Sequence, residues 1–412
     1  MTEEVGELVL RDNYRQTQAL SLSEILSQQG MGPYRRFINE LEAAGGLDRE
    51  LEFLPSDEVL IERANADKGL TLPELSVLIS YAKSALKTDL IASDLPDNPH
   101  VQRHMARAFP HTLVERFSDE MYQHRLKREI TATQIANDLV DHMGISFVRR
   151  LRDSTGASRA EVARAYIIAR DCFNLEGLWE QIEALDYQVD SQVQYGMMLD
   201  LMRLLRRATR WFLRHRTSQG IQEAIEYFAP RVTQLQENIG KRLRGEDREM
   251  WDTRRDELEK AGVPQRLASV IAAAGSLYAG LGIIEAARAT DEKVQRVAEV
   301  YYEIGHRLEL PWMNGQINAL KVRDSWQAQA RETFRDDLDR QQLALSISVL
   351  KMEGAPRDVE PRVDQWLERH AGLVERWCGL LDEVRSGSQG GFPLFAVAIR
   401  ELVDLAESNG EG

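Results

Sequence analysis

Apolar residues recur at spacings of three and four along nearly the whole chain, which places them on one face of successive α-helices. An amphipathic helix is predicted from residue 3 to residue 13, close to the start. The clearest stripe predicts a helix over residues 191–215 and consists of Met197, Met198, Leu201, Leu204, Leu205, Ala208, Trp211 and Phe212. A second stripe predicts a helix over residues 324–350 and consists of Trp326, Ala330, Phe334, Leu338, Leu343, Leu345, Ile347 and Leu350.

Short motifs predict where helices begin and end. Four segments have the pattern [S/T]-x-x-[E/Q], in which the first and last side chains cap a helix start, and they cover residues 21–24, 71–74, 131–134 and 158–161. Pro73 strengthens the second of these. Glycine, proline and aspartate predict loops at residues 30–33, 45–46, 94–99, 153–156 and 386–393.

No series of strands accompanies these helices. The only short alternation covers residues 51–54, and it is too short to build a sheet. No repeat of 20 to 50 residues is visible, which argues against a solenoid. The predicted fold class is therefore all-α, an irregular multi-helix bundle without a substantial sheet. We expect a helical segment over 1–95 that packs on a region outside this sequence, and a helical bundle over 96–412.

Charge and composition narrow the classes of partner. The 412-residue chain has a net charge of −14, which argues against a general binder of nucleic acid or of an anionic membrane. Residues 1–70 contain 14 acidic and 7 basic side chains, so half of the excess lies in this segment. The acidic start is neither a signal nor a transit peptide. The only two cysteines, Cys172 and Cys378, suit a reducing cytoplasm.

The longest uncharged run, residues 267–284, is the one segment that could be tested as a membrane span. It consists mostly of alanine, serine and glycine, and Gly275, Gly280 and Gly282 interrupt it. Because a membrane span normally needs about 20 strongly apolar residues, a buried helix followed by a turn is the better interpretation.

Three constellations could carry chemistry, and the first is the segment Gly280-Leu281-Gly282, which resembles the start of a dinucleotide-binding turn. Such a turn needs a preceding strand and a third glycine, whereas the preceding segment is helical and the third position is Glu285. A corner between two helices is predicted instead.

The second constellation is His100 and His104, four residues apart, with His111 and Glu115 nearby. Two imidazoles on one helix face could bind a metal, but a zinc site needs a third and usually a fourth ligand. Ordinary surface or capping histidines are the preferred interpretation.

The third constellation is a run of arginines on a chain that is otherwise acidic, and residues 201–216 contain no acidic side chain. Its members are Arg203, Arg206, Arg207, Arg210, Arg214 and Arg216. The cluster could contact phosphate, or it could flank the apolar stripe and pair with acidic helices elsewhere in the protein, which we favour. Local spacing yields no Ser-His-Asp set, nucleophile elbow, paired-carboxylate site or Walker loop, so we assign no catalytic, cofactor-binding or metal residue.

Three longer stretches resemble a known family: Leu8-Val9-Leu10-Arg11-Asp12-Asn13-Tyr14-Arg15-Gln16-Thr17-Gln18-Ala19-Leu20-Ser21; Leu72-Pro73-Glu74-Leu75-Ser76-Val77-Leu78-Ile79-Ser80-Tyr81-Ala82-Lys83, followed by Ser93-Asp94-Leu95-Pro96-Asp97; and Leu310-Pro311-Trp312 through Gln316-Ile317-Asn318-Ala319-Leu320 to Trp326-Gln327-Ala328-Gln329-Ala330-Arg331. Together they resemble the C-terminal part of the large bacterial NAD-dependent glutamate dehydrogenases.

The resemblance implies a parent enzyme that converts L-glutamate to 2-oxoglutarate and ammonium, with hydride transfer to NAD. It also implies that the catalytic residues and the NAD-binding turn lie upstream of Met1, so no cofactor is expected in this chain. The expected partners are the catalytic core of the same polypeptide and further copies in a homo-oligomer, with no nucleic acid and no membrane. The alternative is a free-standing helical scaffold or regulatory protein that binds an acidic partner through the arginine-rich helix.

Overall fold

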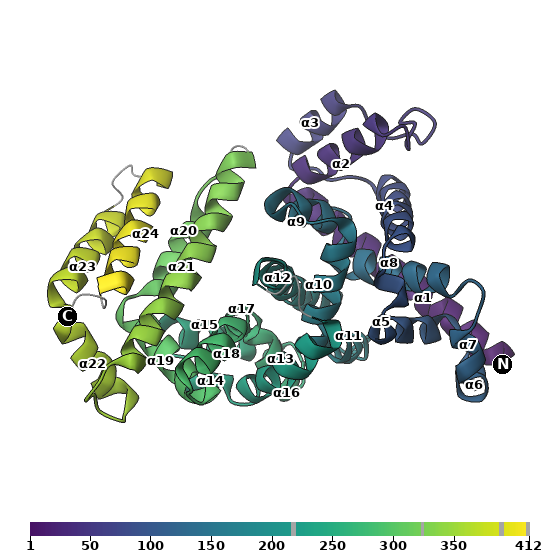
Figure 1. The fold of residues 1–412 in the computed structure, drawn as a ribbon. Coiled ribbons are helices and arrows are strands. Elements are labelled where there is room, and N and C mark those ends of the chain that lie inside the picture. The colour runs from purple at the N-terminus through teal and green to yellow at the C-terminus, as the bar shows by residue number, and fades with distance from the viewer. Residues whose placement is uncertain (216–219, 323–324, 387–390, 409–412) are drawn as a thin grey trace. The chain divides into compact units, whose positions relative to one another are not determined.

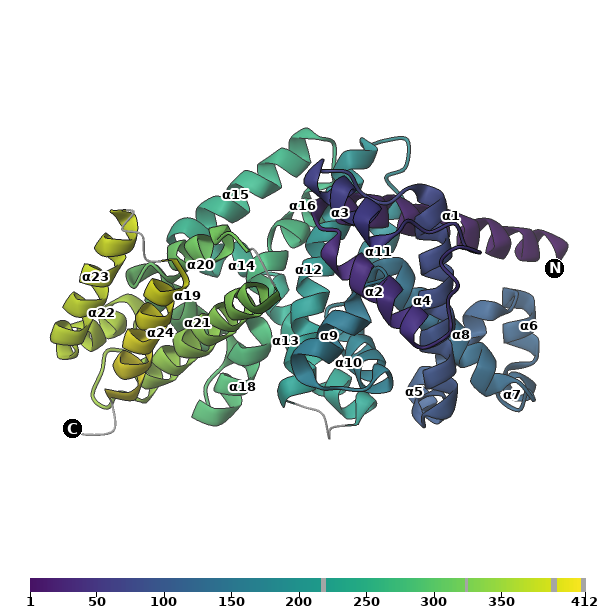
Figure 2. The same ribbon diagram turned by 90° about the horizontal axis from the view of Figure 1, so that it is seen from above.

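The computed structural model describes residues 1–215, 220–322, 325–386 and 391–408. These residues are mostly helical and include no strand, which confirms the predicted all-α fold (Figures 1 and 2). They form two compact units, and the chain passes between the units three times. Unit 1 comprises residues 1–171 and 201–226, and unit 2 comprises residues 172–200 and 227–412.

Unit 1 is built from the N-terminal helices and from the C-terminal part of α12. Its elements are α1 (Thr2–Gln29), α2 (Gly32–Ala43), α3 (Asp57–Asn65), α4 (Leu72–Ala92), η1 (Leu95–Asp97), α5 (Pro99–Gln102), η2 (Arg103–Ala108), α6 (His111–Arg116), α7 (Ser118–Tyr122), α8 (Lys127–Met143), α9 (Phe147–Thr155), α10 (Arg159–Cys172, through Asp171), residues 201–215 of α12 (Ser191–His215) and the start of α13 (Ile221–Gln236).

Helices α4 and α8 pack side by side at the centre of unit 1, and α1 contacts both of them. Leu75 and Leu78 of α4 are buried, as are Ile135 and Leu139 of α8. The first turn of α4 is fixed by Glu74, whose carboxylate accepts a hydrogen bond from the backbone N–H of Thr71 at 2.8 Å. The motif at 71–74 therefore caps a helix as predicted.

The connection into α4 depends on a glycine. The hydroxyl of Ser27, near the end of α1, accepts a hydrogen bond from the backbone N–H of Leu70 at 3.0 Å. A Cβ atom on Gly69 would lie 2.2 Å from that hydroxyl oxygen, so only glycine lets the chain pass this close to α1.

The predicted helix over 191–215 is present as α12, with the predicted bounds. All eight side chains of its apolar stripe are buried. The stripe over 324–350 lies on α21 (Ser325–Lys351) and is buried less completely, since Trp326 is 78% exposed while Leu338, Leu345 and Leu350 are buried.

Unit 2 contains the remaining helices. Its elements are α11 (Leu175–Glu183), residues 191–200 of α12, the rest of α13, α14 (Ile239–Arg242), α15 (Gly245–Lys260), α16 (Gln265–Ala272), α17 (Ala274–Leu277), α18 (Gly280–Thr290), α19 (Val294–Arg307), α20 (Leu310–Ala319), α21, α22 (Val359–Arg369), α23 (Ala371–Arg385) and α24 (Gly391–Glu407).

Helix α19 lies at the centre of unit 2, in contact with α18, α20, α21 and α22. Its Gly305 allows α21 to approach closely, because a Cβ atom there would lie 2.2 Å from Nε2 of Gln342. That buried amide donates a hydrogen bond of 2.9 Å to the carbonyl oxygen of Tyr301. Trp377 of α23 donates its indole N–H to the carbonyl oxygen of Leu308 at 2.9 Å, which ties α23 to the end of α19.

The uncharged run at 267–284 is divided among α16, α17 and α18. Across the described residues, no one helix has the length and apolar content of a membrane span. The helices over 265–272 and 274–290 together are long and apolar enough, but the chain bends by 51° between them.

Two predicted helix starts are wrong. The motif at 21–24 lies inside α1, where the Ser21 hydroxyl donates to the carbonyl oxygen of Thr17 at 3.2 Å. The motif at 131–134 lies inside α8, which begins at Lys127. In both places the helix has already begun upstream of the motif, so the motif alone does not mark a helix start. Of the first residues of the two motifs, only Ser21 bonds back to the preceding helical turn. The motif at 158–161 does cap α10, with a hydrogen bond of 2.8 Å from the Ser158 N–H to Glu161.

Several predicted loops are shorter than expected. Gly32 already begins α2, and residues 95–97 and 99–102 form the short helices η1 and α5. Helix α9 continues to Thr155, and Gly156 then ends it in the left-handed conformation. Of the predicted loop at 386–393, residues 387–390 lie outside the described part of the chain, and α24 begins at Gly391.

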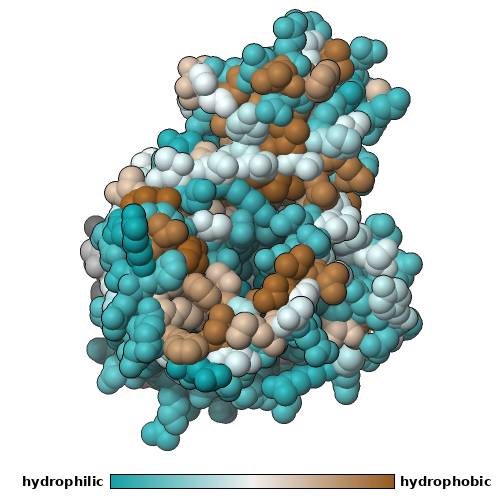
Figure 3. All heavy atoms as spheres, turned by 90° about the vertical axis from the view of Figure 1, so that its right-hand side faces the viewer, coloured by the Kyte–Doolittle hydropathy of each residue, from teal (hydrophilic) through white to brown (hydrophobic). Residues whose placement is uncertain are grey.

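The N-terminal half of α1 projects from the other helices of unit 1 (Figure 2). Val5, Val9 and Leu10 are 45%, 54% and 69% exposed, and Figure 3, which views this side of the molecule, shows apolar patches among hydrophilic side chains. In contrast, Leu75, Leu78 and Ile79 on the apolar face of α4 are buried within the described residues. The two units do not divide at residue 95, and the packing of residues 1–95 on a region outside this sequence remains a prediction.

Candidate functional site

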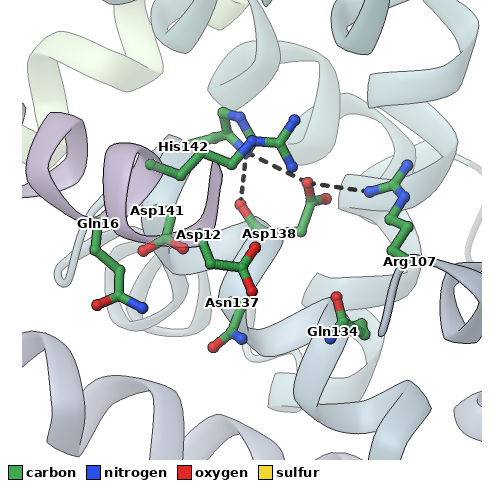
Figure 4. A pocket seen from close by; sticks show the side chains of 9 residues that line it. Asp12, Gln16, Arg107, Gln134, Asn137, Asp138, Asp141 and His142 are labelled. Atoms are coloured by element: carbon green, nitrogen blue, oxygen red, sulfur yellow. Dashed lines mark hydrogen bonds and ion pairs between the residues drawn. The ribbon is translucent and has the colours of Figure 1, made fainter. Parts of the chain in front are cut away.

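The candidate site is a small polar pocket in unit 1, between α1, η2 and α8. It encloses about 30 Å³, enough for one or two water molecules. In Figure 4, Asp12 and Gln16 of α1 face Asn137 and Asp141 of α8. The other lining residues are Arg15, Arg107, Gln134, Asp138 and His142.

Asp138 at the base of this pocket joins a buried ionic network. Its carboxylate is 2.6 Å from Nη1 of Arg170, a side chain that is only 1% exposed. The Tyr166 hydroxyl donates to the same carboxylate at 3.0 Å, and Arg107 lies 3.5 Å away. His142 lies one helical turn beyond Asp138, with Nδ1 at 2.8 Å from the Asp138 backbone carbonyl.

These contacts keep Asp138 ionised. Burial raises the pKa of a carboxyl group, but the guanidinium of Arg170, together with His142 and Arg107, outweighs burial and holds the pKa of Asp138 well below its usual range. Asp141 differs, because its burial outweighs the ion pair of 2.7 Å with Lys83 and raises the pKa of Asp141 above its usual value.

Arg170 links this pocket to a second buried carboxylate, that of Asp171, at 2.7 Å. Asp171 also contacts Nε2 of His100 at 2.8 Å and pairs with Arg103. Burial would raise the pKa of Asp171, but the hydrogen bond to His100 and the two guanidinium groups lower it to about 2.

His104 completes the network as a neutral group. Its Nε2 lies 3.0 Å from Nη2 of Arg170 and can accept a hydrogen bond from it. Burial and the neighbouring positive charges of Arg170 and Arg107 lower the pKa of His104 to about 2. The network therefore consists of fixed charges matched by hydrogen bonds, an arrangement that holds α5, η2, α8 and α10 together and can bind polar groups at its open side.

The four candidate metal ligands lie in two separate places in the structure. His100 and His104 belong to the buried network, so the expectation of surface histidines is wrong for both of them. His111 and Glu115 are exposed and lie 3.7 Å apart on α6. Within the described ranges, no group of three or more His, Cys, Asp or Glu side chains is arranged to hold a metal ion.

The arginine-rich part of α12 has interaction partners. Each of Arg203, Arg206, Arg207, Arg210 and Arg214 makes at least one polar, ring or electrostatic interaction, and Arg210 is buried. Arg216 lies outside the described residues. These arginines flank the buried apolar stripe of α12, as the sequence predicts.

The segment Gly280-Leu281-Gly282 begins helix α18, directly after α17. Among the described residues no strand leads into it, so the predicted corner between helices is confirmed. The geometry of a dinucleotide-binding turn is therefore missing from this segment.

Comparison with known proteins identifies the family. A family model described as "Glutamate dehydrogenase, C-terminal" matches residues 67–404, most of the chain. The chain belongs to this glutamate dehydrogenase family.

Three proteins of the family align with the entire chain. A protein from Halomonas elongata is 71% identical over 411 residues, one from Pseudomonas aeruginosa 51% over 413, and one from Mycobacterium tuberculosis 31% over 413. All three are named NAD-specific glutamate dehydrogenase. The chain spans about a quarter of the length of each, 25 to 26%.

Sequence reasoning about this glutamate dehydrogenase region missed the buried network. Its members lie on segments 100–107, 138–142 and 166–171, and only the packing of η2, α8 and α10 brings them together. The one available signal was Arg170 in an otherwise apolar stretch, Tyr166 to Ala169, where an arginine needs an acidic partner if it is buried.

Proposed function

We propose that this chain is the helical C-terminal region of an NAD-dependent glutamate dehydrogenase. The reaction of the whole enzyme would be oxidative deamination of L-glutamate to 2-oxoglutarate and ammonium, with hydride transfer to NAD. The observation that carries the proposal is 71% identity along the entire chain to a quarter of a protein named NAD-specific glutamate dehydrogenase.

Within that enzyme, the region would serve assembly, while the chemistry would belong to the rest of the polypeptide. Two features support this division of roles. Asp138 and Asp141 of the polar pocket are engaged in ion pairs with Arg170 and Lys83, and the segment that begins like a dinucleotide turn is a helix corner. Homo-oligomerisation and a cytoplasmic location are parts of the same proposal.

The surface best suited to contact the rest of the polypeptide is the N-terminal half of α1. Val5, Val9 and Leu10 expose apolar side chains on a projecting helix, and such a patch is typical of an interaction surface. The first turn of this helix contacts unit 1 at α6, where the Thr112 hydroxyl donates to Glu4 at 2.5 Å.

The experiment compares one double variant with one single variant in the full-length enzyme. Val9→Ser with Leu10→Ser should reduce NADH production and weaken assembly, while the circular dichroism of the 412-residue chain with the same changes stays helical. The control is Val397→Ser, a 53% exposed apolar residue of α24. Full activity and unchanged assembly of the double variant would exclude α1 as the docking surface.

A further inference from the structure

Three arginines of unit 1 surround a single carboxylate, that of Glu40 on α2. Arg149 and Arg152 come from α9, and Arg159 lies in the first turn of α10. Their nearest guanidinium nitrogens are 3.3, 3.4 and 3.3 Å from the carboxylate oxygens of Glu40. All three distances are long for a charge-assisted hydrogen bond, which is normally about 2.7–2.9 Å.

The cluster has more hydrogen-bond donors than acceptors. Nε and Nη1 of Arg149 are both shielded from solvent and have no acceptor in hydrogen-bond geometry. The other acids nearby are Asp153, 3.5 Å from Arg149, and Asp89, 2.7 Å from Arg159. Each guanidinium carries five N–H donors, so the three guanidinium groups together have more donors than these carboxylates have acceptor positions.

Two more arginines add positive charge at the same place. Arg36 of α2 and Arg150 of α9 are exposed, and neither has a hydrogen bond or ion pair to any described residue. Partial burial and repulsion from Arg149, Arg150 and Arg35 lower the pKa of Arg36. A bound anion would relieve this repulsion among like charges.

The wall opposite these arginines is apolar. A cavity of about 20 Å³ lies beside them, lined by Phe37, Leu86, Val140 and Ile145 among others. Hydrogen bonds to an ionised group are stronger next to such a wall, because water screens them less. Glu40 is itself one-third exposed, so its side chain can turn outward into solvent.

We propose that the three arginines around Glu40, where α2, α9 and the start of α10 meet, bind a phosphate group at the position that the Glu40 carboxylate now occupies. Arg149, Arg152 and Arg159 would donate to its oxygens, and Glu40 is the resident carboxylate that the ligand displaces. A phosphate dianion offers four oxygens to the surplus donors and matches the planar fork of a guanidinium. The group could be free inorganic phosphate or the head of a phosphate monoester, which share this chemistry.

The test measures binding to the 412-residue chain by isothermal titration calorimetry. Inorganic phosphate and glycerol phosphate are titrated separately, against chloride at equal ionic strength. We expect saturable binding of at least one of them, and the tighter one identifies the source. Arg152→Ala should weaken that binding about tenfold, which is the loss of one charge-assisted hydrogen bond.

Glu40→Gln distinguishes a binding site from a structural clamp. If Glu40 competes with the ligand, the variant binds phosphate more tightly than the unmodified chain, and phosphate raises its thermal midpoint more. Arg340→Ala, which changes a 68% exposed arginine of α21, should leave binding unchanged. The proposal is overturned if neither phosphate compound binds the unmodified chain better than chloride, or if Glu40→Gln shows no gain.

Discussion

Leu205 lies within the apolar face of α12 and has none of its surface exposed. Leu205→Ala should lower the free energy of unfolding by about 2–5 kcal/mol, because it removes buried methyl groups and leaves a cavity. Urea denaturation followed by circular dichroism measures the change. Leu51→Ala is the control, since that leucine is 72% exposed and its replacement should cost less than about 0.5 kcal/mol. Equal effects of the two substitutions would show that the α12 stripe is not part of the core.

His104 makes unit 1 sensitive to acid. Its pKa is about 2 in the folded chain and 6.5 ordinarily, so below pH 6.5 the unfolded chain binds one more proton than the folded chain. Stability therefore falls as pH falls, by about 1.4 kcal/mol per pH unit, or about 2 kcal/mol between pH 6.5 and pH 5. The carboxyl groups of Asp138 and Asp171, with lowered pKa values, add to this loss only at lower pH.

His104→Gln isolates the histidine, because glutamine keeps a hydrogen-bond acceptor for Arg170 and does not titrate. The comparison is needed because Asp247 changes stability in the opposite direction between pH 5 and pH 7. Burial, together with the negative charges of Glu246 and Asp339, raises the pKa of Asp247 to about 7. Urea unfolding at pH 5, 6 and 7 should show that the unmodified chain loses more stability on acidification than His104→Gln does. Parallel pH profiles would mean that His104 binds a proton in the folded chain.

At the scale of elements, capping side chains determine where two helices of unit 1 begin. Glu74 caps α4 and also pairs with Arg63 at 2.8 Å, whereas Glu161 caps α10 through Ser158. Glu74→Ala should cost about 1–2 kcal/mol and Glu161→Ala about half as much, because only the first loses an ion pair as well as a cap. Thermal unfolding of both variants measures this order. A larger loss for Glu161→Ala would contradict it.

The elements that the sequence predicts correctly are those with a local cause. The bounds of α12 follow from eight apolar residues at helical spacing, and the start of α4 follows from Thr71, Pro73 and Glu74. The motifs at 21–24 and 131–134 failed because the neighbouring residues continue the helix. The buried network and the arginine cluster could not be predicted, because each depends on helices that are distant in sequence and packed together only in the fold.

At the scale of the whole molecule, the 412-residue chain should form no NADH from glutamate and NAD. Hydride transfer requires a fold that positions the nucleotide, and we propose that this fold lies in the rest of the polypeptide. Spectrophotometry at the absorbance of NADH tests this, with the full-length enzyme as the positive control. Measurable turnover by the chain alone would overturn the proposed division of roles.

The threefold passage of the chain between the two units has a consequence for synthesis on the ribosome. Unit 1 needs residues 201–226, which supply the buried side chains of Leu205 and Phe212, so it is incomplete when residue 171 leaves the exit tunnel. The ribosome must translate residues 172–200 before residues 201–226, although residues 172–200 belong to unit 2, whose remaining residues 227–412 are translated later. The N-terminal unit therefore cannot finish folding before residue 226 emerges, and no single cut in the gene separates the two units.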